Sequence, residues 1–452
     1  MTAVKRASWG EALAVYLKPR QLIILIMGFA SGLPLLLTLS TLSYWLSTVG
    51  VDKTTIGLFA LAGTPYTFKF AWSPIIDQMP LPVLGRLMGQ RKSWLFVIQL
   101  MLATAIFALG FTDPAVAPKA TAFAVLVIAF FSASQDIVID AYRIELLSIE
   151  EQGAGAGTTQ VGYRIGLLMA GAGAIALSDY ISWAEIFAVL AGAVLLCAVF
   201  TMFIPEPARR VDTMQTVARQ EFIGRATGKS QAYVAWINGA VVKPFAEFMQ
   251  RRGWVVVLLF VLFYKFGDAF GGTMANPFYK ELGFSGVEIA AITKVYGIIA
   301  TLIGGILGGA VVARIGIFRT LMIGGILQAV TNLLFSYLAL KGHDIVWLGV
   351  AITADNLAGG VAAAAFVAYL SALCNLAFTA TQYALLTSFM AYGRTLMSSP
   401  SGWLIDHLAN DWALFWSLTA LMAIPGLLLI FWISRLYPDE RTIAPAATVV
   451  RA

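Results

Sequence analysis

The sequence is poor in charge for its length. Of its 452 residues, 12% are Asp, Glu, Lys or Arg, about half the share typical of soluble domains, whereas 59% are hydrophobic. A soluble chain of this size would divide into several domains with polar surfaces, and too few charged residues are available to cover them. The composition therefore excludes a soluble enzyme, a nucleic-acid-binding protein and a secreted disulfide-rich scaffold. It indicates a chain whose main solvent is lipid.

Residues and motifs that carry chemistry are also scarce. The two cysteines, Cys197 and Cys374, stand inside or beside apolar runs and are expected to be buried. Because the only histidines are His343 and His407, we expect no metal site. There is no Gly-x-x-x-x-Gly-Lys-Ser/Thr motif for ATP and no Gly-x-Ser-x-Gly nucleophile motif. These absences predict a protein that is not an enzyme and holds no cofactor, so uphill transport would need an ion gradient.

Long apolar runs dominate the rest of the sequence. A membrane-spanning helix needs roughly 20 mostly apolar residues, and twelve runs meet this need. They cover residues 22–47, 55–76, 93–112, 119–143, 158–178, 183–204, 253–278, 287–312, 318–339, 344–371, 379–402 and 412–435. Runs such as 321–340 do not alternate in polarity as the strands of a transmembrane barrel would. The sequence therefore predicts an all-α integral membrane protein with twelve transmembrane helices.

The Lys and Arg residues between these runs predict the orientation. One alternating set of connections, which includes both termini, holds 21 of them, Arg143 included, and the other set holds only Lys53, Lys119, Lys280 and Lys341. Positive residues favour the cytoplasmic side of a membrane. We therefore expect both termini in the cytoplasm.

A polar stretch at residues 205–252 divides the chain into halves, 1–204 and 253–452. It is basic and is expected to be a cytoplasmic linker, either solvated or lying on the membrane surface as an amphipathic helix near 231–250. Residues 50–57, between the first two helices, are similar to residues 283–290, between the seventh and eighth. Two parallel sets of six helices with such a linker resemble the major facilitator fold.

The connection between the second and third helices strengthens this resemblance. Asp77 ends the second helix, and Arg86, Arg91 and Lys92 follow in a glycine-containing loop. The pattern resembles the helix 2–3 signature of that superfamily, in which an acid paired with a basic loop closes the cytoplasmic side. We predict that these four residues form a gate; the alternative is a loop whose positive charge only sets the topology.

Nine charged residues fall inside the predicted helices, more than two positions from either end. Because a charge inside a membrane is costly, each indicates a pathway or a functional pair. They are Lys69, Asp136, Asp140 and Arg164 in the first half, and Lys265, Asp268, Lys294, Asp355 and Arg394 in the second. Five cations against four acids favour an anionic substrate.

Asp136 and Asp140 are four residues apart and share a helix face. Two neighbouring carboxylates do not both ionise easily in a cavity of low dielectric, so the pair is suited to carry a proton. The alternative is static pairing of each acid with Lys69 or Arg164. Lys265 and Asp268 could likewise pair with each other.

Small residues and tyrosines mark two further features. Four glycines, at positions 304, 305, 308 and 309, allow the eighth helix to approach a neighbour closely, either for gating or for packing alone. Tyr66 and Tyr163 stand near intramembrane cations and could line a polar cavity, although packing explains any single tyrosine equally well.

Several segments are similar to AmpG-type muropeptide permeases of bacteria. The segments are 28–34, 68–74, 132–141, 162–164, 264–270, 373–375 and 380–382, and the most specific is SASQDIVIDA at 132–141. The resemblance implies import of N-acetylglucosaminyl-1,6-anhydro-N-acetylmuramyl peptides across the inner membrane, driven by protons. In such bacteria the imported fragments feed peptidoglycan recycling and signal β-lactamase induction.

From the residues and the resemblance together we predict the site. The predicted substrate-binding residues are Lys69, Gln135, Arg164, Tyr66, Tyr163, Lys265, Arg394 and Asn356. The predicted proton-coupling residues are Asp136, Asp140, Asp268 and Asp355. In the empty carrier we expect Arg164 to pair with Asp136 or Asp140, and a substrate carboxylate to compete for it.

The expected partners are an anionic glycopeptide, membrane lipids and protons as the coupling ion, with no nucleic acid, and the expected state is a monomer. Two alternatives remain. The chain could be a major facilitator carrier of another anionic metabolite or peptide, or a muropeptide sensor that does not transport.

Overall fold

The computed structural model describes residues 9–51, 55, 59–207, 242–285, 288–289, 291–376 and 378–437. All regular structure in these ranges is helical, and ten of the helices are long and apolar enough to cross a membrane. Most of the predicted linker, including most of the amphipathic helix proposed near 231–250, lies outside the described residues.

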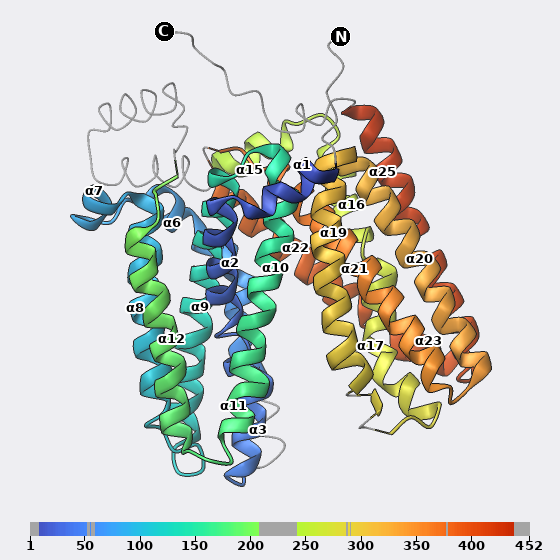
Figure 1. Ribbon diagram of the computed structural model, residues 1–452, viewed down its shortest axis with the longest axis horizontal. Helices are drawn as coiled ribbons and strands as arrows, with labels where there is room; N and C mark the ends of the chain where they lie inside the picture. The colour runs from blue at the N-terminus through green and yellow to red at the C-terminus, as the bar shows by residue number, and fades with distance from the viewer. Residues whose placement is uncertain are drawn as a thin grey trace.

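Two bundles of helices make up the described chain (Figure 1). The N-terminal bundle contains α2 (Pro19–Gly32), α3 (Ser40–Thr48), α6 (Ser73–Gln78), α8 (Gln90–Leu109), α9 (Pro118–Leu146), α10 (Gln152–Leu168), α11 (Ala174–Leu177) and α12 (Trp183–Phe203). The C-terminal bundle contains α16 (Trp254–Phe263), α17 (Phe266–Glu281), α19 (Gly297–Ile315), α20 (Ile317–Lys341), α21 (Ile345–Leu373), α22 (Thr379–Ser398), α23 (Ser401–His407), α24 (Trp412–Leu421) and α25 (Ile424–Leu436).

Several predicted helices are broken where the sequence carries proline or charge. The second is divided into η3 (Ala60–Gly63), α5 (Thr64–Phe68), η4 (Lys69–Ala71) and α6. Pro65 and Pro74 are the second residues of two of these pieces, since proline is tolerated in the first turn of a helix but not in its interior. The seventh is interrupted at Lys265, between α16 and α17. Discontinuous helices at membrane depth are typical of substrate pathways in transporters.

The prediction for the fifth helix, 158–178, was too short. α10 begins at Gln152, directly after η5 (Ile149–Glu151), and continues through the π-helix η6 (Met169–Gly173) into α11. Its first turns hold Gly153, Gly155 and Gly157, whose low hydropathy hid them from a search for apolar runs.

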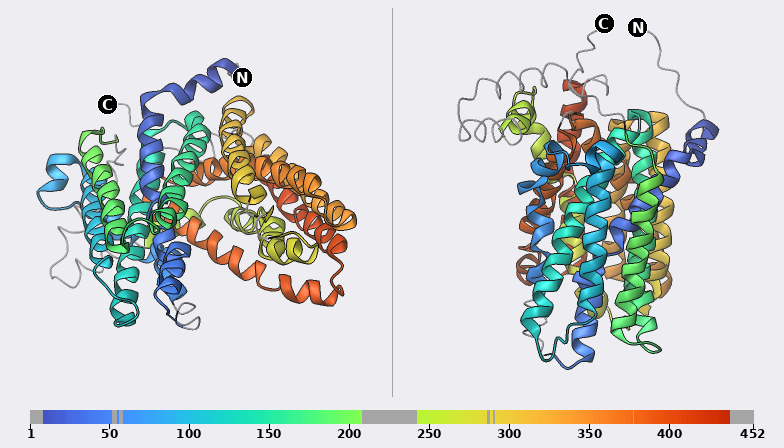
Figure 2. Two further views of the ribbon diagram at one scale, coloured as in Figure 1. Left: turned by 60° about the horizontal axis from the view of Figure 1, so that its bottom comes forward. Right: turned by 90° about the vertical axis from the view of Figure 1, so that its left-hand side faces the viewer.

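The two bundles meet at one end and separate toward the other (Figure 1, Figure 2). We name these the α1 end, where α1 (Trp9–Ala14) lies, and the far end. Across the α1 end, α10 packs on α19 and α21, and α22 packs on α6 and α9. The structure is therefore closed at the α1 end.

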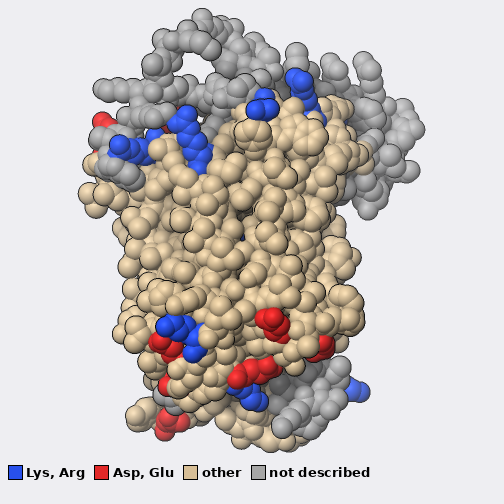
Figure 3. All heavy atoms as spheres, turned by 90° about the vertical axis from the view of Figure 1, so that its right-hand side faces the viewer, with Lys and Arg blue, Asp and Glu red and all other residues tan. Residues whose placement is uncertain are grey.

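The outer surface matches a membrane environment. Figure 3 shows charged side chains gathered near the two ends of one face, with a wide uncharged band between them. Exposed apolar side chains cover the lipid-facing helices, for example Leu196 of α12 and Val330 of α20. An exposed apolar surface of this extent is unfavourable in water. The chain is a multi-pass membrane protein.

Candidate functional site

A cavity of about 280 Å³ lies where the bundles begin to separate. It is lined by polar and aromatic residues from both bundles: Gln160 and Arg164 of α10, Lys265, Asp268 and Tyr279 of the seventh helix, Thr301 of α19, Asn332 of α20, Asp355 and Asn356 of α21, and Trp416 of α24. Five predicted site residues are among them, namely Arg164, Lys265, Asp268, Asp355 and Asn356.

The two cations of this cavity form no close ion pair with the part of the chain that the structure describes. Among the described residues, neither Arg164 nor Lys265 has an acid within 4.0 Å, and Nε of Arg164 is buried without a hydrogen-bond partner. A buried N–H group needs such a partner, since its burial is costly otherwise. One cation comes from each bundle, so an anion in the cavity would contact both halves of the molecule.

The acids of the cavity are instead bound by neutral side chains. Asp268 accepts a hydrogen bond from Nε2 of Gln328, and Asp355 accepts one from Oγ1 of Thr331 at 3.1 Å. The local Lys265–Asp268 ion pair that the sequence left open is not formed within 4.0 Å; Gln328 on α20 binds the acid, and the charge of Lys265 acts on it over a longer distance.

Asn356 is tied to two helices. Its Oδ1 accepts from Thr301 of α19 at 2.7 Å, and its Nδ2 donates to the carbonyl of Ile352 at 2.8 Å. Arg394 is exposed on α22 and interacts electrostatically with Asp268 from outside the cavity lining.

The acids of α9 do not pair as predicted. Asp136 accepts a hydrogen bond from Oγ of Ser31 at 2.6 Å, and Asp140 lies 3.6 Å from Arg143. Neither lies within 4.0 Å of Lys69 or Arg164 in this conformation, so the static pairing that the sequence left open is not formed here, nor is the pairing of Arg164 with either acid. Lys69, at the break in the second helix, acts on Asp136 only through its longer-range charge.

Three other predicted substrate-binding residues do not line the cavity. Gln135 is fully buried and donates to the carbonyl of Ala30 at 2.8 Å, which ties α9 to α2. Tyr66 and Tyr163 lie on α5 and α10, near enough to Asp136 to interact with it electrostatically. Direct contact of these residues with a substrate stays a prediction.

Two of the four predicted gate residues, Asp77 and Arg91, form a buried network at the α1 end. Arg91 lies between two acids, with Nη2 at 2.7 Å from Asp77 and 2.6 Å from Glu145. Oδ2 of Asp77 accepts from the backbone N–H of Thr381 at 3.1 Å and from its hydroxyl at 2.9 Å. Because Thr381 is in the first turn of α22, the acid of one bundle caps a helix of the other.

Of the four predicted gate residues, Asp77 contacts the other bundle, whereas Arg91 contacts acids of its own bundle. Arg86 is exposed on α7 (Leu84–Met88), and Nζ of Lys92 donates to the carbonyl of Met202 within its own bundle. The backbone N–H groups of Arg91 and Lys92 both donate to Glu206, at 2.8 and 3.0 Å. Burial nevertheless raises the pKa of Glu206 above its usual value.

A contact from the N-terminal segment also crosses the α1 end. The hydroxyl of Tyr16, on η1 (Val15–Leu17), donates to the carbonyl of Ile306 on α19 at 2.7 Å. Burial raises the pKa of this hydroxyl well above its usual range, so it remains a donor. The segment before the first membrane helix is therefore hydrogen-bonded to the C-terminal bundle.

Replacing Tyr16 by Phe should weaken closure of the α1 end about fivefold, since one hydrogen bond contributes about 1 kcal/mol. Labelling of a cysteine introduced at the closed interface measures the change. Tyr437→Phe is the matched control, because that hydroxyl donates to the carbonyl of Arg252 at the same 2.7 Å within one bundle. An equal effect of both variants would contradict a role for Tyr16 in closure.

Sequence reasoning missed several residues of the site. Gln160, Asn332, Tyr279 and Trp416 line the cavity, but uncharged residues in an apolar run carry no signal of a pathway. Thr381 was missed as a partner of Asp77 for the same reason.

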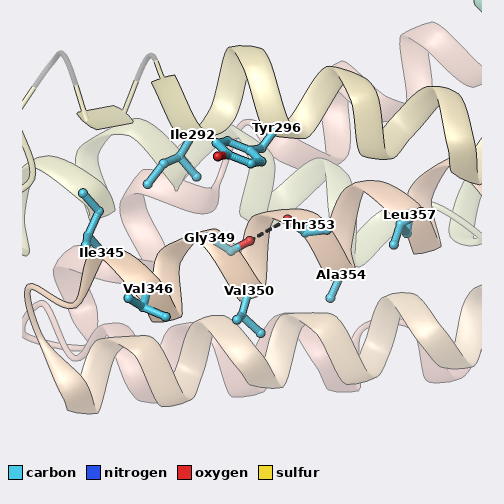
Figure 4. Close-up of a pocket in the computed structure, with 9 residues that line it drawn as sticks. All are labelled: Ile292, Tyr296, Ile345, Val346, Gly349, Val350, Thr353, Ala354 and Leu357. Carbon is cyan, nitrogen blue, oxygen red and sulfur yellow. Dashed lines mark hydrogen bonds between the residues drawn. The ribbon is translucent and has the colours of Figure 1, made fainter.

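A second, larger pocket is apolar. It has a volume of about 650 Å³ between the start of the eighth helix and α21, and Figure 4 shows its lining of mainly aliphatic side chains. The polar groups among them are Tyr296 and Thr353, and Thr353 donates to the carbonyl of Gly349 in its own helix. With no charged lining residue, this pocket does not suit an anionic substrate.

Within the described residues, no three His, Cys, Asp or Glu side chains lie together as metal ligands. The polar groups of the cavity are instead amides, carboxylates and two cations that can bind an organic anion directly.

Comparison with known proteins agrees with this geometry. Residues 24–377 match the family described as the Major Facilitator Superfamily. The anhydromuropeptide permease of Escherichia coli (strain K12) is 37% identical over 422 residues, covering 93% of this chain and 81% of that protein. Putative transporter AmpG 4 of Rickettsia felis is 37% identical over 414 residues, covering 91% of this chain and 96% of that protein.

The fold itself has solved counterparts. The proton:xylose symporter XylE, bound to 6-bromo-6-deoxy-D-glucose, superimposes with a TM-score of 0.68 at 14% identity, covering 91% of this chain and 94% of that one. Two bundles that meet at one end, a charged cavity between them and an acid that caps a helix across the gate are thus features of a transporter. The chain belongs to the major facilitator superfamily and, within it, to the anhydromuropeptide permease (AmpG) family.

Proposed function

We propose that this transporter imports anhydromuropeptides from the periplasm across the bacterial inner membrane, driven by protons. The observation that supports this most directly is a pair of cations in the cavity, Arg164 and Lys265, one from each bundle, neither of which has an acid within 4.0 Å among the described residues. A muropeptide offers carboxylates to the cations and hydroxyl and acetamido groups to Gln160, Asn332 and Trp416. The cavity holds only part of such a substrate, so the rest lies toward the open far end.

The excess of cations in the connections of the α1 end supports a cytoplasmic position for that end. The structure then corresponds to a carrier open to the periplasm. Substrate enters from the far end, the bundles close around it, and the α1 end opens to release it. Asp136 and Asp140 are the acids proposed to take up the coupling proton.

Counterflow in proteoliposomes tests the proposal. Wild-type protein should exchange labelled N-acetylglucosaminyl-anhydro-N-acetylmuramyl tripeptide and should do so faster with an inward proton gradient. Arg164→Gln should lower affinity about 10- to 100-fold, because a hydrogen bond to a charged group contributes about 1.5–3 kcal/mol. The matched control is Arg435→Gln, which removes a cation that lies over Phe431 on α25, outside the cavity.

The outcomes separate the alternatives. Exchange of a dipeptide but not of the muropeptide would indicate a carrier of another anion. Binding without any exchange would indicate a sensor. Exchange of the muropeptide that does not respond to the proton gradient would support the proposed substrate and contradict proton coupling.

A further inference from the structure

Arg143 is a buried cation that crosses the closed α1 end. It lies near the end of α9 with 1% of its side chain exposed. Its Nη1 donates to Gln152 at 3.2 Å and to Ser371 of α21 at 3.1 Å, and its guanidinium lies 5.4 Å from the ring centre of Tyr383 on α22. A single side chain of the N-terminal bundle therefore contacts two helices of the C-terminal bundle.

The charge of Arg143 has one weak counter-charge. Among the described residues, Asp140 is its only acid within 4.0 Å, at 3.6 Å from Nη2, and Nε and Nη2 make no hydrogen bond. Asp140 is 23% exposed, so water reaches it while the guanidinium stays dry. The other ionisable groups around the pair are Asp136, Cys374 and Tyr383.

Arg91, the other buried arginine of the α1 end, is held differently. Its two acids lie within 2.7 Å and are at most 2% exposed. Water has no access to either carboxylate, so their charges are insulated from the cavity. Asp140 therefore differs from the acids of Arg91: it contacts an arginine that bridges the two bundles, and it is exposed to water.

We propose that Arg143 is the positioning residue through which protonation of Asp140 opens the α1 end. A proton from water binds a carboxylate oxygen of Asp140, and the acid becomes neutral. Arg143 keeps its proton because a guanidinium does not deprotonate in proteins. An uncompensated buried cation destabilises the closed state, and the cost is relieved when the bundles separate and water reaches Arg143.

This inference deepens the proposed proton coupling and does not depend on the identity of the substrate. Loss of the proton from Asp140 restores the counter-charge, which favours closure of the α1 end again. Proton uptake by Asp140 is thus linked to opening of the α1 end through a contact within one helical turn.

The test measures opening of the α1 end without substrate, in full-length protein in nanodiscs. Spin labels on Phe203→Cys of α12 and Trp432→Cys of α25 report the distance between the bundles, since both positions are exposed and the native Cys197 and Cys374 are buried. In the wild type we expect the open population to rise as the pH falls. Asp140→Asn should raise it at least tenfold at neutral pH and remove the pH response.

The double variant Asp140→Asn with Arg143→Met gives the decisive measurement. It removes the acid and the charge that the acid compensates, so the α1 end should close again and stay closed at every pH. Arg143→Lys keeps the cation and should keep a pH response. Asp113→Asn, in a connection at the far end, is the control and should behave as wild type.

Three results would overturn the proposal: an Asp140→Asn variant that stays closed, a double variant that stays open, or an Arg143→Met variant that retains the wild-type pH response. None of them bears on muropeptide exchange, so they are distinguishable from failure of the proposed function.

Discussion

Asp77→Ala is expected to open the α1 end and to destabilise the N-terminal bundle at the same time. Asp77 is fully buried and uses its two oxygens differently, one for Arg91 in its own bundle and one for Thr381 in the other. Loss of the Thr381 contacts should shift the equilibrium about 10- to 100-fold toward the open α1 end, since hydrogen bonds to a charged group contribute about 1.5–3 kcal/mol. Distance measurements across the interface check this part.

The second effect of Asp77→Ala acts within one bundle. Arg91 would keep only Glu145 as a partner, and breaking a buried ion pair costs about 3–5 kcal/mol. This cost applies whether the α1 end is open or closed, so it should lower the midpoint of thermal unfolding rather than change the conformation. The two measurements therefore report on the two oxygens separately.

Thr381→Val and Asp77→Asn separate the same contributions. Thr381→Val removes only the hydroxyl contact of 2.9 Å and should shift the conformation at least about tenfold, since a hydrogen bond to a charged group contributes about 1.5–3 kcal/mol, without loss of thermal stability. Asp77→Asn keeps an oxygen that can accept from the N–H of Thr381 but removes the charge. If Thr381→Val had no effect on the distance distribution, the contact would not act as a gate.

The sequence predicted the helices well where lipid is the solvent. The sixth predicted helix, 183–204, corresponds to α12 at Trp183–Phe203, because every lipid-facing turn must be apolar. The first turns of α10 were missed for a physical reason. There the helix faces the other bundle, which requires glycine, and glycine is only weakly hydrophobic.

The candidate site was predicted in part by the same logic. Charges cannot face lipid, so Arg164, Lys265, Asp268 and Asp355 were expected inside and do line one cavity. Their partners could not be predicted, because sequence spacing limits contacts within a helix but not between helices.

Arg143 is a second residue whose contacts between helices could not be predicted from the sequence. The apolar run that predicted the fourth helix ended at residue 143, so Arg143 was assigned to the positive loops that set the topology. In the structure α9 continues to Leu146, which places this side chain inside the interface.

Gly157→Ala is expected to prevent closure of the α1 end. A Cβ at Gly157 would lie 2.6 Å from the carbonyl oxygen of Gly305 and 3.1 Å from its carbonyl carbon. These are backbone atoms of α19 in the other bundle, so no side chain can turn away to make room. The same crossing repeats one turn away, where a Cβ at Gly309 would lie 2.6 Å from the carbonyl oxygen of Gly153. We expect at least a tenfold loss of exchange, with the α1 end trapped open.

Two glycines provide matched controls for Gly157→Ala. A Cβ at Gly192 of α12 would meet no atom within 4 Å, so Gly192→Ala should preserve exchange and stabilise the helix by about 0.5–1 kcal/mol. Gly162, also on α10, faces the carbonyl of Leu25 in its own bundle, so Gly162→Ala should lower the thermal midpoint in every conformation. If the Gly157→Ala protein closed to wild-type distances, α10 and α19 would be able to adjust at their crossing without a free-energy cost. In that case the hydrogen-bonded contacts of Asp77, Arg143 and Tyr16 would hold the α1 end without the glycine crossing.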